Sequence, residues 1–242
     1  MNLNATHRFD LLNDGDHAVL PVNGHRVFLD TGSPMTFKHP AGPDDIHLLG
    51  QEIRLPGVPV PAGRMEEGSR LLDFHFGVLM GMDLMSRLSW RLDWRECTAE
   101  AGAELPDEPG TAWLGLTPSM GAPTSCPSCR VQNGREVALL DTGARLSYVV
   151  GTPSASARWV GQTQDFNPQL GVFDTPVWED ELEIGGHRIP IRFGQVPQPA
   201  PALFEGMGVK WILGSDLLKA FRVTLDFPGG RLGLKPHPKQ EV

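Results

Sequence analysis

Short apolar runs alternate along the whole chain with glycine, proline, asparagine and aspartate. Runs such as 27–29 and 138–140 are too short for helices and are typical of strands bounded by turns. Helix-like spacing occurs only in a few short stretches, among them 84–88 and 217–221. Because 28 glycines and 22 prolines are spread throughout, the pattern predicts a mainly β protein with many short strands and a few short helices.

The same order of features occurs twice. The tripeptide Asp-Thr-Gly at 30–32 recurs at 141–143, and three apolar residues precede each copy. An Asn-Gly pair lies upstream of each copy, at 23–24 and at 133–134, and favours a tight hairpin because both residues tolerate positive φ. Each Asp-Thr-Gly is therefore predicted to end the return strand of a hairpin.

Segments downstream of the two tripeptides also match each other. Residues 79–94 align without gaps on 212–227, and 48–53 resemble 184–189 as a further pair of candidate hairpins. We interpret the chain as a duplication.

The duplication predicts three parts. An N-terminal lobe spans 1–100 and a C-terminal lobe spans 131–242, each of ordinary size for a small domain. The stretch 101–130 between them is rich in proline, glycine and serine and is interpreted as a linker, with a possible strand at 112–116.

Composition narrows the classes of partner. The 242 residues include 29 acidic and 21 basic side chains, a formal net charge of −8, which disfavours nucleic acid or an anionic membrane as partner. No apolar run approaches the length of a membrane span, and the first residues lack the layout of a signal peptide. With only three cysteines, the expectation is a soluble, cytoplasmic protein with reduced thiols. Because the duplication places both tripeptides in one chain, a monomer is expected.

Two aspartates at matching positions suggest a reaction. A single Asp-Thr-Gly is most simply a turn after a strand. A pair brought together by the duplication could hold a water molecule: one ionised carboxylate acts as general base, and the other, protonated, acts as general acid toward a peptide carbonyl. This chemistry needs no metal, nucleotide or covalent intermediate.

The arrangement resembles the pepsin-like and retropepsin-like aspartic proteases. The resemblance rests on two apolar-apolar-Asp-Thr-Gly-Ser/Ala motifs, each followed by an apolar-apolar-Gly segment, and covers most of both lobes. It implies two acid-protease β-barrel lobes with an interlobe cleft, an extended peptide or protein substrate, and no cofactor. The residues that it implies are the catalytic Asp30 and Asp141, the supporting Thr31, Gly32, Ser33, Thr142, Gly143 and Ala144, and the glycines Gly81 and Gly214 of the strands that thread between the arms of the loops.

The chain departs from the pepsin pattern in its flap. The stretch between Phe37 and Ile46 is too short for a projecting hairpin, and the single tyrosine, Tyr148, lies in the second lobe. The extra length of that lobe predicts a hairpin with a turn at 167–168, in which Gln164, Phe166 and Asn167 would form a substrate-binding flap. An ordinary edge hairpin is the alternative.

The residue after each glycine also differs between the copies. The Ser33 hydroxyl could donate a hydrogen bond to the carboxylate of Asp30, whereas Ala144 offers Asp141 no such donor. We therefore expect Asp30 to be the ionised member of the pair, and the pair to work nearer neutral pH than one with two such donors.

Other acidic pairs and the cysteines have simpler explanations. Asp83 and Asp216 open the two helical stretches, and Asp93 and Asp226 end strands, so all four are interpreted as structural. The Cys-x-x-Cys at 126–129 could be redox-active or half a zinc site, but no second pair exists, and ordinary linker thiols are favoured for Cys126 and Cys129.

Two functions from different classes follow. The main hypothesis is an aspartic endopeptidase in which Asp30 and Asp141 activate a water molecule. The alternative is a catalytically silent peptide-binding or assembly protein that keeps the acid-protease fold. The reduced flap of the first lobe and the missing flap tyrosine favour this alternative, whereas the two intact Asp-Thr-Gly motifs disfavour it.

Overall fold

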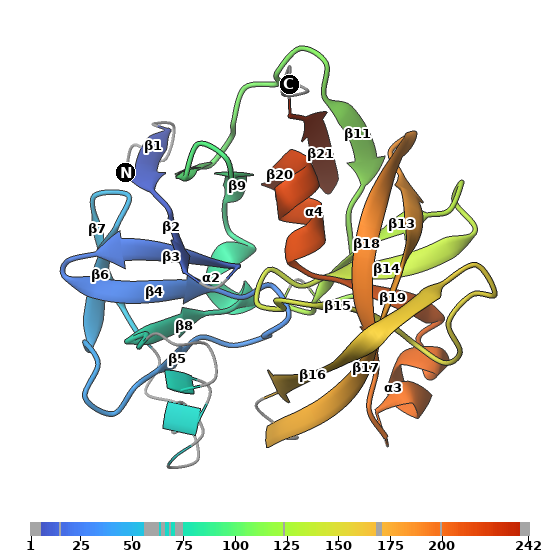
Figure 1. The fold of residues 1–242 in the computed structure, drawn as a ribbon. Coiled ribbons are helices and arrows are strands. Elements are labelled where there is room, and N and C mark those ends of the chain that lie inside the picture. The colour runs from blue at the N-terminus through green and yellow to red at the C-terminus, as the bar shows by residue number, and fades with distance from the viewer. Residues whose placement is uncertain are drawn as a thin grey trace.

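The computed structural model describes residues 6–14, 16–55, 63, 66–67, 69–70, 75–122, 124–167, 171–198 and 200–237. It shows a mainly β protein with two lobes, as Figure 1 illustrates, so the fold class predicted from the sequence is confirmed.

The first lobe is built on a five-stranded sheet. Its strands, in sheet order, are β2 (Leu12–Asp14), β3 (His17–Val22), β4 (His25–Leu29), β8 (Val78–Met80) and β5 (Phe37–Lys38). The turn between β3 and β4 is the predicted Asn-Gly pair, with φ of 49° at Asn23 and 79° at Gly24. The strands β6 (Asp45–Leu48) and β7 (Gln51–Arg54) form a separate hairpin.

The second lobe carries an eight-stranded sheet. Its strands, in sheet order, are β12 (Thr117–Pro118), β13 (Pro127–Val131), β14 (Glu136–Leu140), β19 (Val209–Leu213), β15 (Ser147–Val149), β18 (His187–Gln195), β17 (Gly171–Ile184) and β16 (Arg158–Asn167). The helix α3 (Pro201–Gly206) precedes β19. The β17–β18 turn confirms the hairpin predicted at 184–189.

A six-stranded sheet joins the lobes. Its strands, in sheet order, are β1 (His7–Asp10), β10 (Thr98–Gly102), β9 (Ser89–Asp93), β20 (Phe221–Asp226), β21 (Arg231–Pro236) and β11 (Ala112–Gly115). Strands from the two halves meet where β9 pairs with β20. The strand expected within the linker is confirmed as β11, and it pairs with β21.

Corresponding strands of the two halves have the same pairing. Each Asp-Thr-Gly follows a strand that lies parallel to a later one, β4 beside β8 and β14 beside β19. The helices α2 (Met82–Met85) and α4 (Ser215–Ala220) follow β8 and β19, as the helical spacing predicts. One continuous cluster of buried apolar side chains reaches from the first lobe through β9 and β20 to the second. The core therefore fixes the two loops relative to each other.

Glycine is required where β8 and β19 pass between the arms of these loops. A Cβ atom on Gly81 would lie 2.3 Å from the carbonyl oxygen of Met35, and one on Gly214 would lie 2.4 Å from that of Ala144. Such separations are far inside van der Waals contact, so both positions exclude a side chain. The threading strands expected from the resemblance are present.

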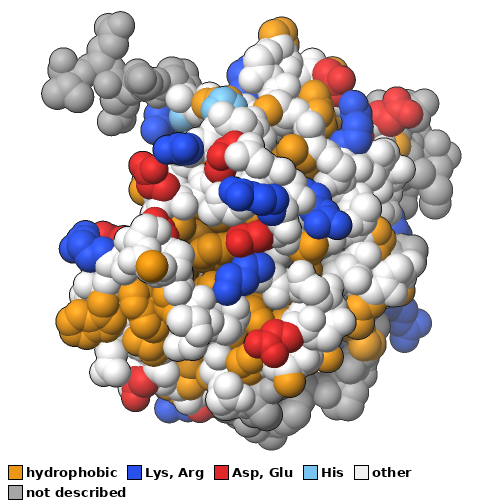
Figure 2. Space-filling view, turned by 90° about the vertical axis from the view of Figure 1, so that its right-hand side faces the viewer, with side chains coloured by type: hydrophobic (Ala, Val, Ile, Leu, Met, Phe, Trp, Pro, Cys, Tyr) orange, Lys and Arg blue, Asp and Glu red, His pale blue; other side chains and the backbone are white. Residues whose placement is uncertain are grey.

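The surface is mixed in charge. Figure 2 shows lysine, arginine, aspartate and glutamate side chains interspersed with apolar ones on the face that it presents. Large apolar side chains that are exposed include Met35, Met120, Trp159, Val172 and Leu203. Within the described ranges, no helix is long and apolar enough to cross a membrane.

Candidate active site

The aspartates of the two tripeptides come together at the lobe interface. The amide of Asp30 donates to the carbonyl of Met80 on β8, and the amide of Asp141 donates to that of Leu213 on β19, each at 2.9 Å. The two carboxyl groups hydrogen-bond to each other. Both residues keep part of their surface open to solvent.

Backbone amides of each loop hold its own carboxylate. Gly32 donates to Oδ1 of Asp30, and Gly143 donates to Oδ1 of Asp141, both at 2.9 Å. Each glycine also lies against the aspartate of the other loop: a Cβ on Gly32 would be 2.4 Å from Oδ2 of Asp141, and one on Gly143 would be 2.6 Å from Cγ of Asp30. Only glycine lets the two carboxyls approach so closely.

The two threonines clamp the loops together. The Thr31 hydroxyl donates to the carbonyl of Leu140 at 2.6 Å, and the Thr142 hydroxyl donates to that of Leu29 at 2.9 Å. Each hydroxyl also accepts the amide of the other threonine, at 3.1 Å for Thr142 and 3.0 Å for Thr31. Four buried hydrogen bonds thus cross between the lobes, and we call this set the threonine clamp.

Each loop is supported by a short relay of hydrogen bonds that runs from a backbone amide through a hydroxyl to a carboxylate. The amide of Gly214 donates to the Ser147 hydroxyl at 3.1 Å, and that hydroxyl donates to Asp216 at 3.0 Å. In the first lobe the hydroxyl of Thr36 stands between Gly81 and Asp83 in the same way. Asp83 and Asp216 therefore orient the loops and lie outside the pair, as predicted.

Asp93 and Asp226 are also structural. Oδ1 of Asp93 accepts the amides of Arg95 and Glu96, and Oδ1 of Asp226 accepts the amide of Gly229. These bonds close the turns after β9 and β20, which confirms the interpretation from the sequence.

Burial raises the pKa of both central carboxyls. Desolvation is the largest cause at Asp30 and at Asp141; at Asp30 the charge of Asp141 adds to it, and loop amides oppose it at both. Two carboxyls in contact cannot both ionise at low cost, so the pair shares one proton and titrates as a unit. The raised pKa values extend the singly protonated state to higher pH.

The expected role of the Ser33 hydroxyl is wrong. It donates to the carbonyl of Met35 at 2.7 Å, and Asp30 receives only the backbone amide of Ser33, at 3.1 Å. The local loop offers the hydroxyl a nearer acceptor. Ser33 and Ala144 therefore do not distinguish the two carboxylates in this structure, and the reason for assigning the charge to Asp30 is removed.

The predicted hairpin exists as β16 and β17. Their pairing runs from Arg158 opposite Glu179 to Asn167 opposite Gly171, while the turn at 168 lies outside the described residues. Gln164, Phe166 and Asn167 all belong to β16. Figure 1 shows the arrowhead of β16 pointing toward the side of the first lobe. Between β5 and β6 of the first lobe the described residues form no strand, as the short spacing predicts.

Sequence reasoning missed two residues that lie near the pair. The Cys126 thiol donates to the carbonyl of Leu140 at 3.3 Å, the same carbonyl that Thr31 binds. Burial, with the charges of Asp141 and Asp30, raises the pKa of Cys126, so the thiol stays protonated. His17, 1% exposed, lies against Phe28 with ring centroids 5.1 Å apart and contacts the backbone of Gly143. His17 lies in no motif, and the Cys-x-x-Cys that contains Cys126 gave no indication of a position beside the pair.

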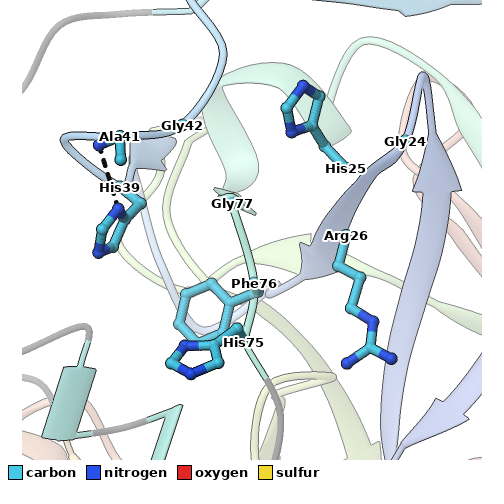
Figure 3. Close-up of a pocket in the computed structure, with 9 residues that line it drawn as sticks. All are labelled: Gly24, His25, Arg26, His39, Ala41, Gly42, His75, Phe76 and Gly77. Atoms are coloured by element: carbon cyan, nitrogen blue, oxygen red, sulfur yellow. Dashed lines mark hydrogen bonds between the residues drawn. The ribbon is translucent and has the colours of Figure 1, made fainter.

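The pocket in Figure 3 is separate from the aspartate pair. It is lined by His25, His39 and His75 with Arg26, at the end of β4 opposite to Asp30. The imidazole rings of His25 and His39 point in different directions in this view, so they do not converge on a common ligand. Within the part of the chain that the structure describes, no three histidine, cysteine, aspartate or glutamate side chains are grouped to hold a metal ion.

Comparison with known proteins identifies the fold. A fungal aspartic proteinase from Irpex lacteus matches with a TM-score of 0.55 and 12% sequence identity, over 98% of this chain and 99% of that chain. The fold is that of a pepsin-like aspartic proteinase. Basic 7S globulin from soybean matches over 95% of this chain and 94% of its own, at 10% identity and a TM-score of 0.48. No protein-family model and no curated protein sequence matches the chain.

The threonine clamp should be a major source of interlobe stability. Thr142→Val keeps the shape of the side chain but leaves the Leu29 carbonyl and the Thr31 amide without their partner. Each buried group left unpaired costs about 1–3 kcal/mol, so the free energy of unfolding should fall by about 2–6 kcal/mol. Urea unfolding measures the loss. Thr152→Val, at an exposed position, is the control, and an equal stability of the two variants would contradict the prediction.

His17 should make the protein less stable in acid. Burial is the main cause that lowers the pKa of His17 from 6.5 to about 4. In the unfolded chain the imidazole of His17 is protonated near pH 6.5, whereas in the folded chain it stays neutral until about pH 4. The contribution of His17 to the free energy of unfolding is therefore fully present above pH 6.5, and it falls by about 3 kcal/mol as the pH drops to 4. The aspartate pair acts in the opposite sense, because its raised pKa values favour the folded state as pH falls.

The contribution of His17 is isolated by difference. Urea unfolding of wild type and His17→Gln between pH 4 and 7.5 should show a flatter dependence on pH in the variant. His47→Gln, at an exposed position, should follow the wild type. If the free energy of unfolding depends on pH in the same way in His17→Gln and in the wild type, His17 is not the cause of the lower stability in acid.

Proposed function

We propose that the chain is an aspartic endopeptidase that hydrolyses peptide bonds by activating water between Asp30 and Asp141. The observation that carries this proposal is the contact between the two carboxyls, each held by the amide of its own loop glycine and locked by the threonine clamp. Structural turns do not need two carboxyls in contact, because such a contact is unfavourable when both groups are ionised. Here the charge of Asp141 adds to desolvation in raising the pKa of Asp30.

The singly protonated pair supplies both halves of the reaction. The ionised carboxylate removes a proton from the bound water as that water attacks the scissile carbonyl carbon. The protonated carboxyl donates its proton to the carbonyl oxygen, which gives a tetrahedral gem-diol. Proton transfer to the leaving amine then breaks the C–N bond and restores the shared proton. The supporting residues of the two loops act by holding the two aspartates in place; they are Thr31, Thr142, Gly32, Gly143, Ser33 and Ala144.

The proposed substrate is an extended polypeptide that lies between the lobes, pairs with the chain through backbone hydrogen bonds and contacts the β16–β17 hairpin. In this proposal Gln164, Phe166 and Asn167 form a single flap that the second lobe supplies. A monomer suffices, since one chain carries both aspartates. We also propose a cytoplasmic location without nucleic-acid or membrane partners, which the acidic balance supports.

One observation favours a second candidate, a peptide-binding or assembly protein without turnover. The described residues between β5 and β6 form no strand, so the first lobe offers no projecting hairpin over the pair at that position. Peptide binding without cleavage would support this candidate.

Asp30→Asn and Asp141→Asn should each abolish cleavage. Either change removes one member of the acid–base pair, and general acid–base catalysis alone contributes about 10²–10⁴-fold to rate. The measurement is cleavage of a diverse peptide library by wild type and both variants from pH 4 to 8. Asp107→Asn, at an exposed linker position where the carboxylate pairs with Arg231, should retain wild-type rates. Retained cleavage in either variant of the pair would rule out the mechanism.

Phe166→Ala tests the flap. If the hairpin contacts substrate, loss of this ring should lower kcat/KM about tenfold, mainly through KM, because about 1.4 kcal/mol of apolar contact is removed. Trp159→Ala, which removes an exposed ring at the other end of β16, is the matched control. Equal kcat/KM for Phe166→Ala and wild type would make the hairpin an ordinary edge element.

A further inference from the structure

The only tyrosine of the chain makes a buried hydrogen bond to the hairpin. Tyr148 lies on β15, the strand that leaves the second aspartate loop, and its hydroxyl donates to Oδ2 of Asp165 on β16. The two residues are 8% and 7% exposed. Oδ1 of Asp165 accepts the amide of Phe166 at 2.8 Å, so both carboxylate oxygens have donors. A buried carboxylate satisfied in this way is held in one position.

Two further contacts join the same elements. Arg145, which follows the second Asp-Thr-Gly-Ala, donates from Nη2 to the carbonyl of Gln164 at 3.3 Å. The Tyr148 ring packs against Phe173 of β17, with ring centroids 6.3 Å apart. Both strands of the hairpin are therefore attached to the segment 145–148, only a few residues beyond Asp141.

The attachment also brings a third carboxylate toward the pair. The charge of Asp165 acts on Asp141 and raises its pKa, and the charge of Asp141 reaches Tyr148. The other titratable or charged groups around Asp141 are Asp30, the Cys126 thiol, and Arg145 and His17 beside its loop. Among these groups Asp165 is the carboxylate that the hairpin contributes.

We propose that Tyr148 and Asp165 are positioning residues of the aspartate pair: their hydrogen bond anchors the β16–β17 hairpin to β15, and it holds the carboxylate of Asp165 where its charge acts on the pair. This role deepens the proposed peptidase function and rests on it. The signal in the sequence was the single tyrosine, placed seven residues after Asp141 in the second lobe.

Two variants test the hydrogen bond and the charge separately. Tyr148→Phe keeps the ring against Phe173 but removes the donor. Asp165→Asn removes the charge; with its oxygen on the Phe166 amide, the side-chain amide can still donate to the oxygen of the Tyr148 hydroxyl, so a hydrogen bond between the two residues is kept. Asp174→Asn, at an exposed position beside Phe173 on the same hairpin, removes an equal charge and is the matched control.

Hydrogen exchange measures the anchor without any substrate. Tyr148→Phe should increase the exchange rate of amides in β16 and β17 about tenfold, with β9 and β20 unchanged, since local openings follow local contacts. Asp165→Asn and Asp174→Asn should exchange as the wild type does. Unchanged exchange in Tyr148→Phe would overturn the anchor.

Carbon-13 NMR of labelled aspartate carboxyls measures the charge effect. In Asp165→Asn the titration of the Asp30–Asp141 pair should move to lower pH, on the order of one pH unit, because a nearby negative charge is removed. If cleavage is found, the pH profile of kcat/KM should move in the same direction. If the pair titrates in Asp165→Asn at the same pH as in the wild type and in Asp174→Asn, the charge of Asp165 does not act on the pair, and this part of the proposal is overturned.

These readouts keep the two proposals distinct. A chain that cleaves no peptide but shows the exchange and titration changes would refute the peptidase function and retain the linkage between hairpin and pair. A chain that cleaves peptides through Asp30 and Asp141, with neither change, would refute the linkage alone.

Discussion

Everything in this structure depends on keeping two carboxyl groups in contact at the junction of two lobes. The contact is unfavourable when both groups are ionised, and burial makes it more so. The threonine clamp provides the opposing stabilisation, because four buried hydrogen bonds cross between the loops and no solvent can replace them. Glycine at 32 and 143 completes the arrangement by leaving room for the partner carboxyl.

The interlobe sheet carries this local constraint into the rest of the molecule. The β9–β20 pairing joins the halves through backbone hydrogen bonds, and the shared apolar core beneath it includes Trp90, which is fully buried. A relative movement of the lobes would have to disturb this core as well as the clamp. The relays through Thr36 and Ser147 then connect each loop to the helix that follows its threading strand.

The two lobes support their aspartate loops in the same way but differ in the elements that surround those loops. The first has a short connection between β5 and β6, whereas the second has the long β16–β17 hairpin, tied to its own loop by Tyr148 and Arg145. The symmetry of the pair is therefore broken by its surroundings. In the proposed function the second lobe both contributes an aspartate and contacts the substrate.

Much of the fold and of the candidate site could be predicted from the sequence, because those features depend on local chemistry. Asn-Gly pairs specify tight turns, short apolar runs specify strands, and the repeated Asp-Thr-Gly indicated which two loops would meet.

Contacts between distant segments could not be predicted in the same way. From the sequence, the Ser33 hydroxyl could donate to the carboxylate of Asp30 or to a backbone carbonyl. Only the folded loop shows that it donates to the carbonyl of Met35. Cys126 and His17 adjoin the pair through packing that leaves no periodic trace. Tyr148 was visible as a residue, but its partner Asp165 was decided by the register of the hairpin against β15, which is a property of the tertiary structure alone.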